Sequence, residues 1–162
     1  MLEKVKRPKR QKQTWEAGDF FMIPLNDGTF SLGQVVSLEP GALNSLVATF
    51  YDARCSSQDA DPSALQKEAT LLAVLFVTRD LLDSGHWKVF GNARPPDVRQ
   101  YLNVEASRKR GYINARITGS GIVQQFLNAC HCLEPWNQFH KPDYLDHLLV
   151  SPDRKPAKLL MK

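Results

Sequence analysis

The densest group of potential metal ligands in the sequence lies at positions 130–132. Cys130, His131 and Cys132 carry the thiolate and imidazole donors that zinc prefers. Structural zinc sites usually separate paired ligands by two to four residues, and adjacent side chains on a helix point in divergent directions. Cys55 is the only other cysteine, so no second closely spaced pair completes a site. We interpret Cys130 as a small core residue and expect no metal or other cofactor.

Ser120, which stands between Gly119 and Gly121, is the candidate nucleophile of the sequence. A nucleophile elbow has the pattern Gly-x-Ser-x-Gly, but here Thr118 and Ile122 occupy the positions of the outer glycines. A phosphate-binding loop would continue with Lys and Ser or Thr after its last glycine. We therefore predict a tight strand-to-helix turn capped by Ser120 or Gly121, and we expect that the chain is not an enzyme.

Four further residues could contact a partner protein. Asp80 and Asp83 flank a polar turn near Trp87, and Asp52 ends an expected strand. Paired carboxylates can do acid and base chemistry, but nothing around them specifies a substrate pocket. A solvated loop is one interpretation. The functional alternative is a protein-binding surface in which an aromatic anchor and acidic groups meet a basic partner.

The charge of the chain is concentrated at its two ends. The formal net charge is +4 and the isoelectric point is about 9.0. Residues 1–13 hold six basic residues and one acidic residue, and residues 154–162 hold four basic residues, which leaves −5 for residues 14–153. We predict a disordered basic arm over 1–13, a single folded domain over 14–153 and a basic tail over 154–162. An acidic body argues against a nucleic-acid partner, because a protein that binds a nucleic-acid groove carries its basic residues on the folded face.

The apolar pattern predicts strands first and helices second. Residues 20–25 and 29–38 flank Asn26-Asp27-Gly28, which predicts a hairpin, and further strands are expected at 46–51, 71–77, 87–90 and 112–117. Residues 56–63 are expected to form an exposed loop. Apolar residues at helical spacing after Gly121 predict an amphipathic helix, and Pro142 precedes a second, short helix. This order indicates an α+β domain with a mostly antiparallel sheet, for which an SH3-like barrel is one form.

Size and composition are those of a globular domain in the cytoplasm. The chain has 162 residues, of which 43% are hydrophobic, and no apolar run is long enough for a membrane span. Three cysteines fit reduced thiols better than a disulfide framework. We therefore expect a cytoplasmic protein that does not bind membranes.

Motifs in a fixed order run through most of the body. They are Gly18-Asp19-Phe20-Phe21-Met22-Ile23-Pro24-Leu25, Asp27-Gly28, Phe30, Gly33-Gln34-Val35, Val77-Thr78-Arg79, Gly85, Trp87, Ile117, Gly119-Ser120-Gly121-Ile122-Val123, Phe126-Leu127-Asn128-Ala129, Leu133, Pro135-Trp136, Pro142, Tyr144-Leu145-Asp146 and Leu148-Leu149. In this order they resemble immunity protein family 26 of bacterial polymorphic toxin systems. The resemblance implies a protein made beside a secreted toxin, which binds that toxin and prevents self-intoxication. Many polymorphic toxins are nucleases, so an acidic body that occupies a basic nuclease cleft is the implied mode of inhibition.

Two other functions remain as alternatives. Small PemK-type endoribonucleases have compact SH3-like barrels with an early Gly-Asp strand, which Gly18-Asp19 resembles. Gln34 stands where such an enzyme would be expected to have an arginine, and no basic active-site cluster is evident on the body. The second alternative is an SH3-like adaptor that binds nucleic acid.

Overall fold

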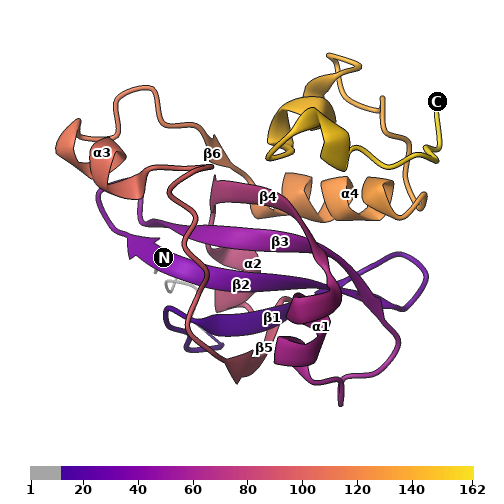
Figure 1. The fold of residues 1–162 in the computed structure, drawn as a ribbon, viewed down its shortest axis with the longest axis horizontal. Coiled ribbons are helices and arrows are strands. Elements are labelled where there is room, and N and C mark those ends of the chain that lie inside the picture. The colour runs from indigo at the N-terminus through magenta and orange to yellow at the C-terminus, as the bar shows by residue number, and fades with distance from the viewer. Residues whose placement is uncertain (1–11) are drawn as a thin grey trace, which may run out of the picture.

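A six-stranded sheet forms the centre of the molecule (Figure 1). The computed structural model describes residues 12–162. The strands are β1 (Asp19–Pro24), β2 (Phe30–Glu39), β3 (Ser45–Cys55), β4 (Thr70–Val77), β5 (Lys88–Asn92) and β6 (Ile117–Thr118). Their order in the sheet is β5-β1-β2-β3-β4-β6, and all pairs are antiparallel except β4 with β6. The prediction of an α+β fold with a mostly antiparallel sheet is confirmed. The sheet is open, with β5 and β6 at its two edges, so the SH3-like barrel is not formed.

Within residues 12–162, four α-helices and two 3₁₀ helices surround the sheet. They are α1 (Pro62–Glu68), α2 (Asp80–Asp83), α3 (Val104–Lys109), α4 (Ser120–Cys130), η1 (Tyr144–Leu148) and η2 (Pro152–Arg154). The amphipathic α4 was expected, and the short helix expected after Pro142 is the 3₁₀ helix η1. The remaining helices were not predicted. The helix α1 begins where a loop was expected, because Pro62 suits a first helical position and the Asp61 carboxylate accepts a hydrogen bond from Ser63 N.

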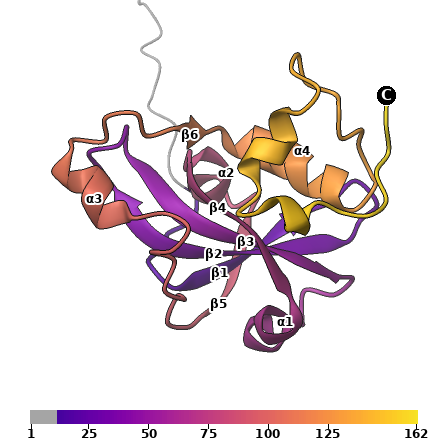
Figure 2. The same cartoon turned by 45° about the horizontal axis from the view of Figure 1, so that its top comes forward.

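Both faces of the sheet are apolar, and each has its own cover. On one face, apolar residues of β1, β2, β3 and β4 pack with Trp87, α4 and η1. Phe21 is central there: its ring stacks on Trp87 at 5.2 Å and meets Phe50 edge-on at 6.0 Å. On the other face, α1 covers one half and residues 93–116 cover the other half. Figure 2 shows α2, α4 and the C-terminal segment above the sheet and α1 below it.

The hairpin β1–β2 forms around the predicted turn. Gly28 has a φ of +84°, which few residues other than glycine adopt, and the Asp27 carboxylate accepts hydrogen bonds from the Thr29 backbone and hydroxyl. The side chains of β2 do not alternate regularly between the two faces of the sheet. An irregularity between Val35 and Ser37 changes which side chains face inward, so Val35 is buried and Leu38 is 42% exposed.

The strand predicted over residues 112–117 is wrong for most of its length. Tyr112 and Asn114 have φ of +61° and +64°, which is incompatible with an extended strand, and Ala115 N donates to Tyr112 O in a turn. Only Ile117 and the following residue pair with β4. The apolar residues of this segment alternate in the sequence although most of the segment does not pair in the sheet, and Ile113 is 67% exposed.

Both terminal segments contact the domain where the structure describes them. Lys12 N and Gln13 N donate to Asp83 O, and the Gln13 side chain donates to Leu82 O and Trp87 O. Residues 1–11 of the predicted basic arm lie outside the described residues. In the C-terminal tail, Trp136 N donates to Leu160 O. Positions 12–13 and 160 are thus ordered parts of the fold.

A substitution at Gly33 tests the packing of the Phe21 ring. Gly33 pairs with Phe21 across β1 and β2, and a Cβ there would overlap the Phe21 ring, which is held between Trp87 and Phe50. We expect Gly33→Ala to lower the free energy of unfolding in urea by about 1–3 kcal/mol. The control is Gly121→Ala in α4, where nothing lies within 4 Å of the added Cβ. Wild-type stability of Gly33→Ala would contradict this packing.

Candidate protein-binding surface

The structure separates the four residues expected to form a partner surface. Asp80 and Asp83 begin and end α2, whereas Asp52 lies opposite Thr70 at the far end of β4. Because β4 extends from Thr70 to Val77, about 23 Å of strand separates Asp52 from α2. Trp87 is 0% exposed, and its indole N–H donates to Gln124 Oε1 at 3.0 Å. The aromatic anchor expected on the surface is therefore a core residue, since its large ring fills the space beneath α2 and α4.

Asp80 joins the end of β4 to the start of α4. Its Oδ1 accepts hydrogen bonds from the Thr78 hydroxyl at 2.6 Å and from the Ser120 hydroxyl at 2.7 Å. Ser120 N in turn donates to Thr78 Oγ1. Gly119 is the N-cap and Ser120 is the first helical residue, which corrects the predicted cap. Ser120 is 1% exposed and its hydroxyl is committed to a carboxylate, an arrangement suited to holding the helix in place.

Asp83 fixes the chain before β1 against α2. One carboxylate oxygen accepts from Trp15 Nε1 at 2.8 Å, and the other accepts from Arg79 Nε at 2.8 Å. The Arg79 guanidinium also lies 5.0 Å from the centre of the Trp15 ring. The carboxylates of Asp80 and Asp83 therefore stabilise the fold through hydrogen bonds within the domain.

Asp52 is exposed, like Asp80, whereas Asp83 is half-buried. Its side chain is 55% exposed, and its carboxylate lies 4.0 Å from His131 Nε2. Burial lowers the pKa of His131, although the Asp52 charge opposes this. Within residues 12–162 no group of three His, Cys, Asp or Glu side chains is arranged to hold a metal ion. Cys130 is buried in the core as expected, and burial raises the pKa of its thiol.

Asp52 belongs to an exposed acidic end of the molecule. We use "acidic end" for five exposed carboxylates on the β1–β2 turn, the end of β3 and the region of α1: Asp27, Asp52, Asp59, Asp61 and Glu68. Arg54 and Lys67 are the basic residues on the same elements, and Arg54 pairs with Asp27. In Figure 1 the β1–β2 turn and α1 lie at one end of the sheet and α3 at the other.

The opposite end of the molecule is basic. Residues 94–116 hold six basic and two acidic residues, and all eight are exposed. The net charge of −5 over residues 14–153 is therefore unevenly distributed, with an acidic end and a basic end. The basic run at 108–110 was visible in the sequence, but its position across the sheet from Asp52 depends on the path of the chain after β5.

An ion pair between a buried carboxylate and a half-exposed guanidinium anchors the basic end, and sequence reasoning missed it. The Glu39 side chain is 0% exposed, and its two oxygens accept from Arg108 Nε at 2.8 Å and Nη2 at 2.6 Å. The Tyr112 hydroxyl also donates to Glu39 at 2.9 Å. Burial raises the pKa of Glu39, but the hydrogen bonds and the Arg108 charge outweigh it, so the net pKa is lowered. Glu39 and Arg108 are 69 residues apart, and no local pattern predicts their contact.

Comparison with known proteins identifies the family. The fold and its surface define a small α+β domain with charged ends of opposite sign. The sequence pattern of the family Immunity protein 26 matches residues 16–108, which is more than half of the chain. The chain therefore belongs to the Immunity protein 26 family. The quoted motifs after residue 108 lie outside that match.

Two other comparisons gave no match, one with curated proteins and one with solved structures. Among the described residues, no helix is long and apolar enough to cross a membrane.

The Glu39 pair predicts a stability change that depends on pH. Arg108→Met leaves the buried Glu39 carboxylate without its cation, and we expect the free energy of unfolding in urea to fall by about 2 kcal/mol near pH 7. Because the folded pKa of Glu39 is lowered from 4.5, its contribution is present above that pH and is lost as the pH falls through the folded value. The difference in the free energy of unfolding between the wild type and Arg108→Met should therefore be smaller near pH 3.5 than near pH 7.

Two further variants complete this test. In the double variant Glu39→Gln with Arg108→Met, no unpaired carboxylate is buried at position 39, so it should be more stable than Arg108→Met alone. Arg99→Met removes an exposed pair with Asp97 and should be neutral. A deficit in Arg108→Met that is the same at both pH values would contradict the role assigned to Glu39.

Proposed function

We propose that this protein binds and neutralises a cognate secreted toxin by direct contact, within the cytoplasm of the cell that makes both. The observation that carries the proposal is the family match over residues 16–108. An immunity protein needs a stable surface that complements its toxin and needs no catalytic groups of its own. The hydrogen bonds of Asp80, Asp83 and Ser120 hold α2 and α4 in place, which gives this part of the surface a fixed shape.

We propose further that the toxin is a nuclease and that the acidic end enters its basic cleft. A nuclease cleft attracts the phosphate backbone, so it also attracts a set of carboxylates held on a rigid surface. Asp52 lies in the last part of β3 with its side chain more than half exposed, and Asp59, Asp61 and Glu68 are exposed on the segment that follows. Asp80 and Asp83 are a secondary contact in this proposal, on a different part of the surface.

Co-expression tests the function itself. The toxin domain is taken from the reading frame beside the gene for this chain. Growth arrest caused by that domain should be relieved by the wild-type chain, and the two proteins should co-purify at equal stoichiometry. Failure of both rescue and co-purification would contradict the proposal. Cleavage of added RNA by the purified chain, abolished by one point mutation, would support the endoribonuclease alternative instead.

Charge reversal at Asp52 tests the acidic end. We expect Asp52→Lys to reduce the association rate with the purified toxin domain by about tenfold at low salt, with a smaller effect at high salt, because steering between opposite charges is screened. Surface plasmon resonance measures both rates. The matched control is Asp143→Lys, whose carboxylate is 66% exposed and pairs with His147 away from the acidic end.

An equal change in association rate for Asp52→Lys and Asp143→Lys, or no change for either, would contradict the acidic-end contact.

The isosteric variants Asp80→Asn and Asp83→Asn test α2, because they keep acceptor oxygens for Ser120 and Trp15. Loss of affinity in these variants without loss of stability would place α2 in the interface as well.

A further inference from the structure

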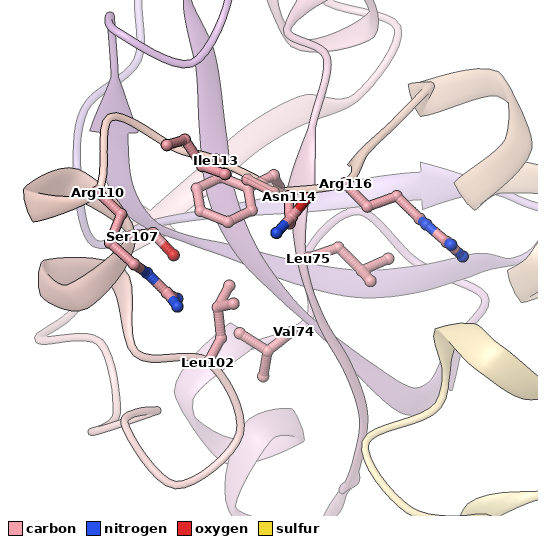
Figure 3. A pocket seen from close by; sticks show the side chains of 10 residues that line it. Val74, Leu75, Leu102, Ser107, Arg110, Ile113, Asn114 and Arg116 are labelled. Atoms are coloured by element: carbon pink, nitrogen blue, oxygen red, sulfur yellow. The ribbon is translucent and has the colours of Figure 1, made fainter.

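A pocket opens beside the basic end, between β4 and the turn after α3 (Figure 3). Its volume is about 310 Å³. Val74 and Phe76 of β4 are buried at its base, and Leu75 and Leu102 are partly exposed there. The floor is mainly aliphatic and has room for a large apolar side chain.

Two arginines stand at the rim of this pocket. Arg110 and Arg116 are exposed, and Figure 3 shows them on opposite sides of it. Within residues 12–162 neither guanidinium forms a hydrogen bond or an ion pair, whereas the guanidinium of Arg108 is held by Glu39. Arginine presents a planar fork of donors that matches a carboxylate. The rim is therefore equipped to bind acidic groups on either side of an apolar side chain.

The turn that forms the pocket wall is held in shape before any partner arrives. Tyr112 is tied to Glu39 through its hydroxyl and to Ser107 through its backbone N–H. Tyr112 and Asn114 both have positive φ, a backbone conformation that residues other than glycine seldom adopt. A wall fixed in this way loses little entropy on binding.

Exposed apolar side chains gather at the same end of the sheet. Ile113 is 67% exposed on the pocket wall, and Leu43 is 88% exposed in the β2–β3 turn. The two turns are in contact, because the Tyr112 ring lies against Gly41. Large apolar side chains left in water beside free cations are typical of a protein interface.

We propose that this pocket binds an acidic polypeptide segment of a partner, with one large apolar side chain in the pocket and flanking carboxylates on Arg110 and Arg116. The site lies at the opposite end of the domain from the acidic end, so it is a second binding site and does not depend on the proposed contact with a toxin. A protein partner is favoured over nucleic acid because unpaired bases stack on exposed aromatic rings, whereas this floor is mainly aliphatic.

Fluorescence anisotropy tests the pocket directly. The probe is a labelled peptide, Gly-Glu-Asp-Leu-Glu-Asp-Gly, titrated with the full chain near physiological salt. We expect saturable binding that weakens about tenfold in Arg110→Glu and in Arg116→Glu. Ile113→Ser should also weaken binding, and a peptide with Ser in place of Leu should bind less tightly than the probe.

Lys109→Glu is the matched control, because Lys109 is exposed on α3 beside Arg110 but does not line the pocket. It should change the affinity by less than about twofold. Urea unfolding of each variant shows that the fold is retained. An equal loss in Lys109→Glu and Arg110→Glu, or no binding of the probe, would overturn the proposal. Tighter binding of a single-stranded DNA oligomer, lost in the same arginine variants, would also overturn it and assign the pocket to nucleic acid.

Discussion

Burial of both faces of β3 is the constraint on which the rest of the structure depends. Leu46, Ala48 and Phe50 face one layer of the core, and Val47 and Tyr51 face the other. A strand that is apolar on both sides must be covered on both sides. One cover is α4 with the C-terminal segment, and the other is α1 with residues 93–116. The polar contacts of Asp80, Asp83 and Glu39 hold these covers in position.

This double cover also separates the charges of the molecule. The segment that crosses the second face carries six of the basic residues, and it is anchored at one end of the sheet by the Glu39–Arg108 pair. The turn and helix at the other end carry the exposed carboxylates. The domain therefore offers two chemically different surfaces, one suited to a basic partner and one to an acidic segment. Charge separation of this kind orients an approaching partner before contact.

The sequence predicted those elements whose signals are local. The Asp27-Gly28 turn, the β2 strand, the first part of β3 (residues 46–51), the apolar β4 and the helix α4 are all determined by periodicity or turn chemistry within a few residues. The expected strand at 112–117 failed because alternation alone does not reveal the positive φ of Tyr112 and Asn114. The helix α3 was missed because it is only six residues long.

The candidate site was less predictable than the fold. Asp52 is exposed because buried and exposed residues alternate in the last part of β3, but the burial of Trp87 depends on Phe21 and Gln124, which come from distant parts of the chain. The pairing of Glu39 with Arg108 depends on the same kind of long-range contact. Composition gave the net charge of the body correctly and yet suggested a uniformly acidic surface, because charge counts carry no information about which residues lie together.

A titration of toxin activity tests most directly the claim that this protein acts by contact. The activity of a fixed amount of the purified toxin domain is measured after mixing with increasing amounts of the chain, at concentrations well above the dissociation constant. Binding predicts a linear fall that reaches zero at about one equivalent and does not progress with time. Continued loss of toxin activity over time at a small fraction of one equivalent would mean catalytic inactivation and would contradict the account.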